Sequence, residues 1–509
     1  MIRIVLLALL PAFASAQTLE RGNGPEPDSL DPHRAQGLSA QQILRDLYEP
    51  LVRENASGEA ELAAASGVQV SDDGLIYTFQ LREDGRYSDG QLVTAEDFKA
   101  SLERALDPAT GAAYGAMLRP IRGASERLEG NKVPLCIEAP ETLTLRICLS
   151  TPRADFLRRL SLPVAMPVPR RNFEHGARFT RPGVLIGNGA YVLSEWVPQS
   201  TIVLTRNPHF RQPAPIERVR YHVTEDAAHE LKRFTVGELH LTETIPPGQA
   251  ARLRTQFGDR LHIAPAYATF FLGFNLRQPE LKNPALREAL SLAIDRDILT
   301  RHITGNGELP LYGVLPNSSA QTIDKAAREA DARARFAAAG FARETAPTIE
   351  LRYNTSLVNR RLGLAIAAMW REVLGVQTRL RHEEWRSFVV SRREARITQV
   401  FRAGWFGDYQ DPVNFLEPFT SDHPLNATGF ADAEFDTLVA QAATGIDAEN
   451  AIASAEQRLL HANALIPLFQ YTSKHLVSEQ ICGFAAHPLD HHPSSSMRFC
   501  EQRTGERDK

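Results

Sequence analysis

The alternation of apolar and polar residues predicts a β-hairpin near the start of the chain. Two alternating runs fill residues 68–82, and the Asp73-Gly74 pair between them is a typical hairpin turn. Residues 348–380 are predicted to form a strand, a helix and a second strand. Such a β-α-β unit predicts an α/β protein with a mixed sheet covered by helices. Further strands are predicted at residues 191–193, 201–204, 219–223, 269–276 and 465–469.

Helices are predicted where apolar residues recur at the helical period. Residues 40–51 form one such segment, for which Ser39 is the predicted N-cap. Thr94 and Asp97 approximate a capping box at the start of another helix. Longer helical segments are predicted over residues 284–304 and from 430 to about 464, and a shorter one over residues 227–236.

One stretch combines a strand pattern with several side chains that could bind a ligand. It reads Arg402-Ala403-Gly404-Trp405-Phe406-Gly407-Asp408-Tyr409, so an apolar run ends in small and aromatic residues and then in a carboxylate. This pattern predicts a strand that feeds a loop, and loops at strand ends often present binding groups. Two interpretations stay open. The loop contacts a ligand, or Trp405 and Tyr409 pack a core while Asp408 caps the following turn.

The N-terminus has the pattern of a secretory signal. Met1-Ile2-Arg3 is followed by an apolar run and then by Ala14-Ser15-Ala16, so cleavage is predicted after Ala16. The apolar run is well short of the roughly 20 residues that span a membrane. No cysteine stands at the predicted cleavage site, which argues against a lipid anchor. We therefore expect a soluble exported protein whose mature chain begins at Gln17.

Length, charge and missing motifs narrow the function classes. A chain of 509 residues exceeds what one hydrophobic core usually holds, so two or three domains are expected. The formal net charge is −4, so no basic field is expected to attract nucleic acid. The sequence contains neither Gly-x-Ser-x-Gly nor His-Glu-x-x-His, and Gly187-Asn188-Gly189 lacks the third glycine of a dinucleotide-binding loop. We therefore predict neither enzymatic activity nor a cofactor.

The four cysteines fall into two local pairs. In an exported protein such pairs are more often disulfides than metal ligands, and their spacings match no zinc motif. We expect Cys136–Cys148 to close a β-hairpin and Cys482–Cys500 to hold the C-terminal tail.

Three histidines, His487, His491 and His492, lie between the second pair of cysteines. A metal-binding tail is one interpretation of this cluster. A solvated, proline-rich coil held by the disulfide is the other, and the sequence favours it.

Three parts of the chain together resemble one protein family: the stretch around Asp408, the block at 68–98, and the run at 187–210. The family is solute-binding protein family 5, the oligopeptide- and dipeptide-binding proteins of bacterial ABC importers. The resemblance covers nearly the whole mature chain and implies a bilobal α/β periplasmic binding protein (type II-like, cluster C) with mixed sheets and an extra domain. Such proteins close around a ligand by hinge motion, and residues 264–268 would form one hinge.

The resemblance also implies a domain organisation. Residues 1–16 would be the signal peptide and 61–183 the extra domain, inserted in lobe I. Lobe I would comprise residues 17–60, 184–266 and 471–509, and lobe II residues 267–470.

In oligopeptide binders of this family, an aspartate in a segment like Arg-Ala-Gly-Trp-x-x-Asp-Tyr pairs with the ammonium group of the peptide. Here that residue is Asp408. Arg402 with Arg392 or Arg393 match the family's arginines by position, and a planar guanidinium suits a peptide carboxylate. The other ligand contacts implied are Gly404, Trp405 and Trp385 in lobe II, Tyr114 in the extra domain, and Leu38 and Ser39 beside the first helix.

The sequence also departs from the family's pattern. Thr304 and Asn359 stand where some oligopeptide binders carry a lysine and a histidine that meet peptides of other lengths. The preference for peptide length is therefore left open.

The implied ligand is an extended peptide whose main chain pairs with strand edges, while its side chains lie in roomy, wet pockets. A monomeric periplasmic protein would deliver it to the permease subunits of an inner-membrane ABC importer. Two alternatives stay open: a non-peptide solute such as an opine, a sugar or a metal chelate, and a periplasmic chaperone or signalling receptor.

Overall fold

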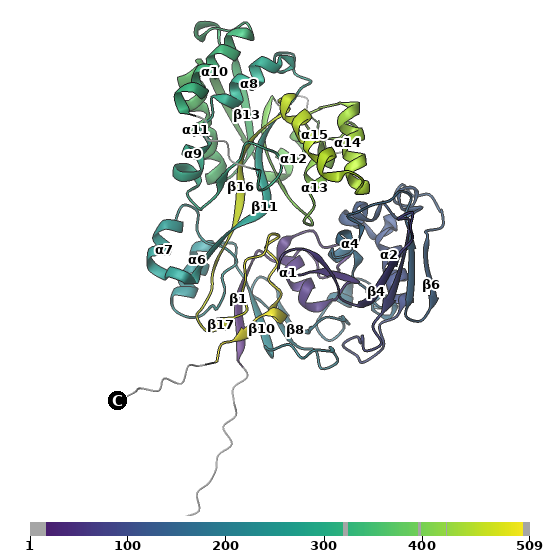
Figure 1. Cartoon of the computed structure of the whole chain (residues 1–509). Coiled ribbons are helices and arrows are strands. Elements are labelled where there is room, and N and C mark those ends of the chain that lie inside the picture. Colours follow the sequence, from purple (N-terminus) through teal and green to yellow (C-terminus); the bar gives the residue numbers. More distant parts are fainter. Residues whose placement is uncertain (1–16, 319–323, 395–398, 424, 502–509) are drawn as a thin grey trace, which may run out of the picture.

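The computed structural model describes residues 17–318, 324–394, 399–423 and 425–501. Most of its strands lie in three sheets, which helices cover, so the prediction of an α/β protein is confirmed. We call them the N-terminal sheet, the small sheet and the large sheet. Figure 1 shows the large sheet with its helices in the upper part of the view and the other two sheets below it.

The N-terminal sheet has the strand order β1-β10-β9-β8. β1 (Thr18–Gly24) runs parallel to β10 (Arg218–Val223), and β9 (Thr201–Arg206) is antiparallel to both β10 and β8 (Tyr191–Val197). Helix α1 (Leu38–Leu47) packs its apolar face on this sheet and shares one hydrophobic core with it. The strands predicted at 191–193, 201–204 and 219–223 are therefore confirmed.

The start of α1 differs from the prediction. Gly37, not Ser39, is the N-cap residue. The carboxylate of Asp28 accepts hydrogen bonds from the backbone N–H groups of Gln36 and Gly37 at 2.7 and 3.1 Å, which fixes the chain just before the helix. Ser39 therefore falls inside the first turn, where its side chain is buried.

The small sheet is antiparallel, with the order β4-β5-β7-β6. The predicted hairpin is confirmed as β4 (Ala65–Val70) and β5 (Ile76–Leu81). The predicted disulfide Cys136–Cys148 is formed beside the hairpin of β6 (Ile137–Glu141) and β7 (Thr144–Cys148). The capping box of Thr94 and Asp97 is also confirmed, at the start of α2 (Ala95–Ala105), which packs on this sheet.

The large sheet has the order β12-β16-β11-β15-β13-β14 and is mixed. The predicted β-α-β unit is confirmed, because α11 (Leu357–Leu374) joins β13 to the parallel β14. The strands are β11 (Leu261–Phe274), β12 (Leu309–Pro310), β13 (Thr348–Asn354), β14 (Gln377–Glu383), β15 (Val400–Phe406) and β16 (Leu465–Leu476).

Two long helices predicted from the sequence are each divided. Residues 284–304 form α8 (Pro284–Leu292), then α9 (Arg296–Ile298), then a π-helical turn. The break occurs where the Asp295 side chain accepts a hydrogen bond from the Ile298 N–H at 2.9 Å and so starts a new helix. The segment from 430 forms α14 (Ala433–Thr444) and α15 (Ala448–His461), because Gly445 adopts φ +83° and ends the first of them.

Two strands extend beyond the large sheet. Figure 1 shows β11 and β16 running together from the large sheet toward α6 (Ala227–Thr235) and α7 (Ala250–Phe257). Their pairing begins at Leu261 with Leu476, and its register shifts between Pro265 and Thr269. The predicted hinge at residues 264–268 therefore falls on an irregular part of a continuous strand pair.

The C-terminal tail is packed rather than solvated, so the expectation of a solvated coil is wrong. The disulfide Cys482–Cys500 is formed as predicted. His487 and His492 are each only 6% exposed, because the tail lies against α1 and β16. The remaining elements are β2 (Val52–Glu54), β3 (Ala60–Leu62), β17 (Ile481–Cys482), β18 (Arg498–Phe499), α3 (Ala124–Leu128), α4 (Phe156–Arg159), α5 (Arg170–Phe173), α10 (Lys325–Ala338), α12 (Trp385–Glu394) and α13 (Val413–Leu416).

Candidate ligand-binding site

Strand β15 carries the arginine, glycine and tryptophan of the candidate site and has one open edge. It pairs with β11 along its whole length, from Val400 to Phe406. On its other side β13 pairs only with Val400 and Phe401. From Arg402 to Phe406, this edge has no strand partner in the described part of the chain. Its backbone can therefore pair with an added extended chain.

Asp408 follows directly on this strand and is held by Asn414 of α13. The Asn414 amide oxygen accepts hydrogen bonds from the Trp405 Nε1–H at 2.8 Å and from the Asp408 backbone N–H at 3.2 Å. Burial raises the pKa of the Asp408 carboxyl group to about 6, although a hydrogen bond with Asn414 and the charge of Arg159 lower it. One buried amide thus positions both the indole and the carboxylate.

A phenol from another segment lies within range of the charge of this carboxylate. Tyr114 lies in a 3-10 turn (Ala113–Leu118) beside the small sheet. Burial, followed by the charge of Asp408, raises the pKa of the Tyr114 phenol to about 12, and Gln41 of α1 hydrogen-bonds to the same phenol. The structure therefore brings Asp408, Tyr114 and Gln41 together from three distant parts of the sequence.

The two interpretations of this loop apply to different residues. Tyr409 is fully buried in the core of the small sheet, and its hydroxyl donates a hydrogen bond to Asp155 at 2.8 Å. Asp411 forms an ion pair with Arg158 of α4 at 2.9 Å. Asp408, by contrast, is partly exposed at the point where the three segments meet. The core-packing residue and the candidate binding residue are thus neighbours in the chain.

At the other end of β15, Arg402 lies among aromatic rings. Its Nη2 donates a hydrogen bond to the Tyr471 hydroxyl at 2.9 Å, and its guanidinium lies 5.0 Å from the centre of the Phe270 ring. Its buried Nε–H has no hydrogen-bond partner among the described residues. Burial, followed by the charge of Arg402, lowers the pKa of the nearby Arg392. Neither arginine forms an ion pair with an acidic group in the part of the chain that the structure describes.

The remaining residues predicted to contact the ligand differ in how exposed they are. Gly404 and Trp405 line a cavity of about 80 Å³, together with Arg392. Trp385 is 50% exposed at the start of α12, beside Phe388. Leu38 is 59% exposed one turn before Gln41, whereas Ser39 is 5% exposed and offers little surface to a ligand. The Arg393 side chain lies outside the described residues.

The two positions that depart from the family's pattern are buried and have partners. The Thr304 hydroxyl donates a hydrogen bond to Glu308 at 2.8 Å, and Glu308 forms an ion pair with Lys474 at 3.2 Å. The Asn359 amide donates a hydrogen bond to the Asn354 side chain at 3.0 Å. Asn359 also lines a small cavity together with Arg402.

Sequence reasoning missed three residues of this site: Gln41, Asn414 and Tyr471. Gln41 could have been found, because it lies one helical turn after Leu38 on the same face of α1. Asn414 follows closely on the Asp408 loop and was open to the same reasoning. Tyr471 contacts Arg402 only because β16 and β15 both pair with β11. No local sequence pattern predicts that contact.

Comparisons with known proteins show the family of the chain. The model of bacterial extracellular solute-binding proteins, family 5 Middle, matches residues 59–426. The chain is 32% identical to the periplasmic oligopeptide-binding protein OppA of Escherichia coli (strain K12), over 97% of this chain and 95% of that protein. It is 30% identical to the probable deoxycholate-binding periplasmic protein YgiS of the same organism, over 94% and 93% of the two chains.

A solved structure shows the same fold. The murein tripeptide-binding protein MppA of Escherichia coli superposes with a TM-score of 0.82 at 32% identity, over 96% of this chain and 99% of that one. None of the described helices has the length and apolar character needed to cross a lipid bilayer. The fold is therefore that of the periplasmic binding proteins, and the family consists of solute-binding proteins rather than enzymes. This chain belongs to the bacterial extracellular solute-binding proteins of family 5.

Proposed function

We propose that this protein captures oligopeptides in the periplasm and delivers them to the permease subunits of an inner-membrane ABC importer. The signal peptide would be removed after Ala16, and the mature protein would act as a monomer. The observation that supports the proposal is the edge of β15, which has no strand partner beyond Phe401 among the described residues and lies between a partly buried carboxylate and two arginines that have no acidic partner there. Relatives whose names specify oligopeptides or murein peptides support the same ligand class.

The chemistry of the two ends fits a free peptide. Asp408 would accept hydrogen bonds from the terminal ammonium group, and Arg402 with Arg392 would donate to the terminal carboxylate. Each charge-assisted hydrogen bond contributes roughly 1.5–3 kcal/mol net. Between the two ends, the main chain of the peptide would pair with β15. The protein would then not recognise the peptide side chains specifically, so peptides of varied sequence would bind.

The spacing of the two ends suggests a length. Arg402 and Asp408 are six positions apart in the sequence. β15 rises roughly 3.3 Å per residue as far as Phe406, so we infer that peptides of a few residues would span the two ends.

Native mass spectrometry of the protein purified from the periplasm of its host tests this proposal. The expected result is a set of peptides of varied sequence and similar length, released on denaturation. A single non-peptide mass would overturn the peptide assignment. The relative named as a probable deoxycholate-binding protein supports that second candidate, because a bile acid also presents a carboxylate to arginines.

A further inference from the structure

Two histidines and an aspartate meet where the C-terminal tail crosses β16, away from the candidate peptide site. His475 belongs to β16, and Asp490 and His492 lie in the tail loop closed by the disulfide Cys482–Cys500. The His475 and His492 residues are only 3% and 6% exposed, so the cluster is an interior feature.

The three side chains converge on one point. The His475 Nε2 lies 2.8 Å from the Asp490 Oδ1, and the His492 Nε2 lies 2.9 Å from the same oxygen. One ligand atom from each residue lies within 4.8 Å of the other two. Two imidazole nitrogens and one carboxylate oxygen at such separations are the donor set of many zinc sites.

The orientation of the His475 ring is fixed by a hydrogen bond on the side away from Asp490. Its Nδ1 lies 2.9 Å from the backbone carbonyl oxygen of Thr242. Because carbonyl and carboxylate oxygens can only accept, both ring nitrogens of His475 carry hydrogens in the ion-free protein, and a bound metal ion would take the place of the Nε2 proton. A backbone carbonyl behind the ring is a common support for metal-binding histidines. The ring of Phe484 stacks on His492 at 4.3 Å and meets His475 edge-on at 5.5 Å, which holds both imidazoles in place.

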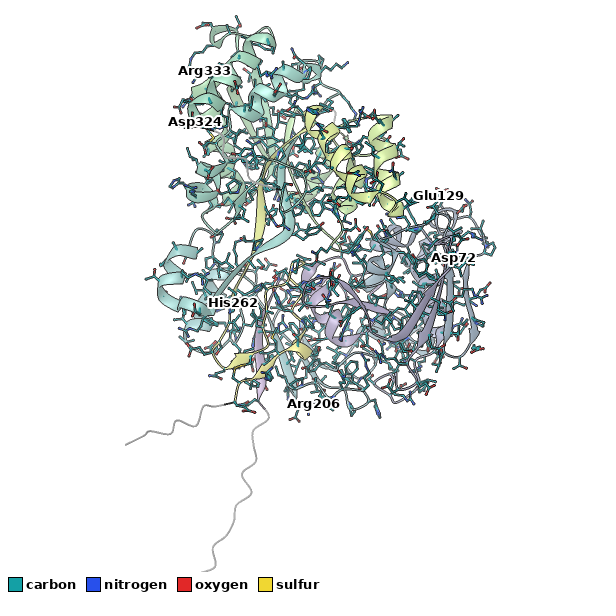
Figure 2. The ribbon with its side chains drawn as sticks, in the orientation of Figure 1. Asp72, Glu129, Arg206, His262, Asp324 and Arg333 are labelled. Carbon is teal, nitrogen blue, oxygen red and sulfur yellow. A yellow bond between two sulfur atoms is a disulfide. The ribbon has the colours of Figure 1, made fainter. Side chains whose placement is uncertain are left out.

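The cluster can be reached from solvent-accessible space. A cavity of about 260 Å³ is lined by both histidines of the cluster and by His262, which Figure 2 labels at the lower end of β11. An ion could therefore enter and keep a water molecule as a fourth ligand. A tetrahedral ion with bonds of about 2.0–2.1 Å needs its ligand atoms roughly 3.4 Å apart, so each imidazole nitrogen would move about half an ångström away from the Asp490 oxygen.

We propose that His475, Asp490 and His492 form a binding site for a divalent transition-metal ion of the zinc class. The ion would join the tail to β16 through one ligand on the strand and two on the tail. It would thereby add a second crosslink to the segment that the disulfide already closes, and metal binding would stabilise the folded state.

In a second cluster in the same tail, one histidine has both ring nitrogens bound to backbone groups. Glu54, His487 and His491 also gather within 4.8 Å of one another. Both ring nitrogens of His487 are engaged, the Nε2 with the carbonyl of Asn55 and the Nδ1 as acceptor from backbone N–H groups. Arg45 lies 3.8 Å from the Glu54 carboxylate and repels a cation there. His487 therefore provides a matched control on the same tail.

The test is titration of the full-length mature protein, first stripped with a chelator and dialysed, with Zn²⁺ alone in a calorimeter. We expect one ion to bind per chain and the melting temperature to rise with Zn²⁺. His492→Gln and Asp490→Asn should each weaken Zn²⁺ binding at least about tenfold, whereas His487→Gln should bind as the unmodified protein does. Co²⁺ absorption gives an independent reading, because a tetrahedral site with histidine ligands absorbs strongly in the visible range.

Folding of each variant is checked by circular dichroism and by the intact mass of the disulfide-bonded chain. Absence of stoichiometric Zn²⁺ binding by the unmodified protein would overturn the proposal. Equal Zn²⁺ affinity in correctly folded His492→Gln and Asp490→Asn would overturn it as well. Loss of binding in His487→Gln alone would assign the ion to the other cluster and contradict the site proposed here.

Discussion

The two ends of the candidate peptide site are built differently. At the Asp408 end, Asn414 of α13 fixes the backbone of the carboxylate, and Tyr114, which Gln41 of α1 hydrogen-bonds, lies within range of its charge. At the arginine end, Arg402 has a phenol and an aromatic face but no acidic partner among the described residues. The first end is preorganised around a single charge. The second is an array of cations around small cavities, which suits carboxylates at more than one position.

The largest expected effect is at the preorganised end. Asp408→Asn keeps the shape of the side chain but removes its charge, and the peptide ammonium would then be buried without a counter-charge. We expect binding of trialanine to weaken by about 2–5 kcal/mol in calorimetry. N-acetyl-trialanine, which has no ammonium group, is the control ligand, and its weaker binding should be the same in both proteins. Equal loss for both peptides would show that Asp408 acts on the fold rather than on the amine.

A smaller effect is expected at the arginine end. Arg402→Gln removes one of two cations, and Arg392 remains beside it, so the loss should be about 1.5–3 kcal/mol for trialanine. The loss should nearly vanish for the C-terminally amidated peptide. Arg361→Gln, an exposed arginine on α11, is the matched control and should leave binding unchanged. An undiminished loss with the amidated peptide would separate Arg402 from the carboxylate.

The pH dependence of binding should identify the same carboxylate. The pKa of Asp408 in the free protein is raised to about 6, mainly by burial, so the group takes up a proton as the pH falls through 6. Protonation removes the charge that the ammonium needs, and affinity is therefore full above this pH and lost below it. From pH 7 to pH 5 we expect trialanine to bind about tenfold more weakly. Asp408→Asn should abolish this dependence, and a slope that persists in the variant would place the titrating group elsewhere.

The Asp408 carboxyl group makes the free energy of unfolding depend on pH in the opposite direction from most aspartates. Because the folded-state pKa of Asp408 lies above its ordinary value of 3.8, the folded protein holds this proton more tightly than the unfolded chain does. Its contribution to the free energy of unfolding is full below about pH 4 and is lost as the pH rises toward 6. The group therefore lowers the stability of the free protein at neutral pH, where it is needed for binding.

The accuracy of the sequence-based predictions depended on how local each feature is. The Asp73-Gly74 hairpin, the Thr94 capping box and the strand leading to Asp408 were predicted because neighbouring residues decide them. The helix over 284–304 was predicted too long, because the apolar period continues across Asp295 while its side chain starts a new helix there. The period of apolar residues predicts which face of a helix is buried, but it does not show where an N-cap residue starts a new helix.

Contacts between distant segments were the part that the sequence could not supply. Tyr471 contacts Arg402 across two strand pairings, and Tyr114 lies within range of the charge of Asp408 although it belongs to a distant 3-10 turn. The burial of His492 was missed for the same reason. A tail rich in proline and histidine is predicted to be solvated, and only its contacts with β16 and Phe484 show that it is buried.

The smallest expected effect comes from Tyr114, and it tests whether the region around Asp408, Tyr114 and Gln41 belongs to the binding site. Tyr114→Phe removes one hydroxyl that Gln41 hydrogen-bonds and that lies close enough to Asp408 to sense its charge. Because a neutral hydrogen bond contributes about 0.5–1.5 kcal/mol net, trialanine should bind about two- to tenfold more weakly. The loss should disappear in the Asp408→Asn background, since the hydroxyl acts beside the carboxylate. If the two losses simply add, Tyr114 and Asp408 are independent, and the amine end is made by the β15 loop alone.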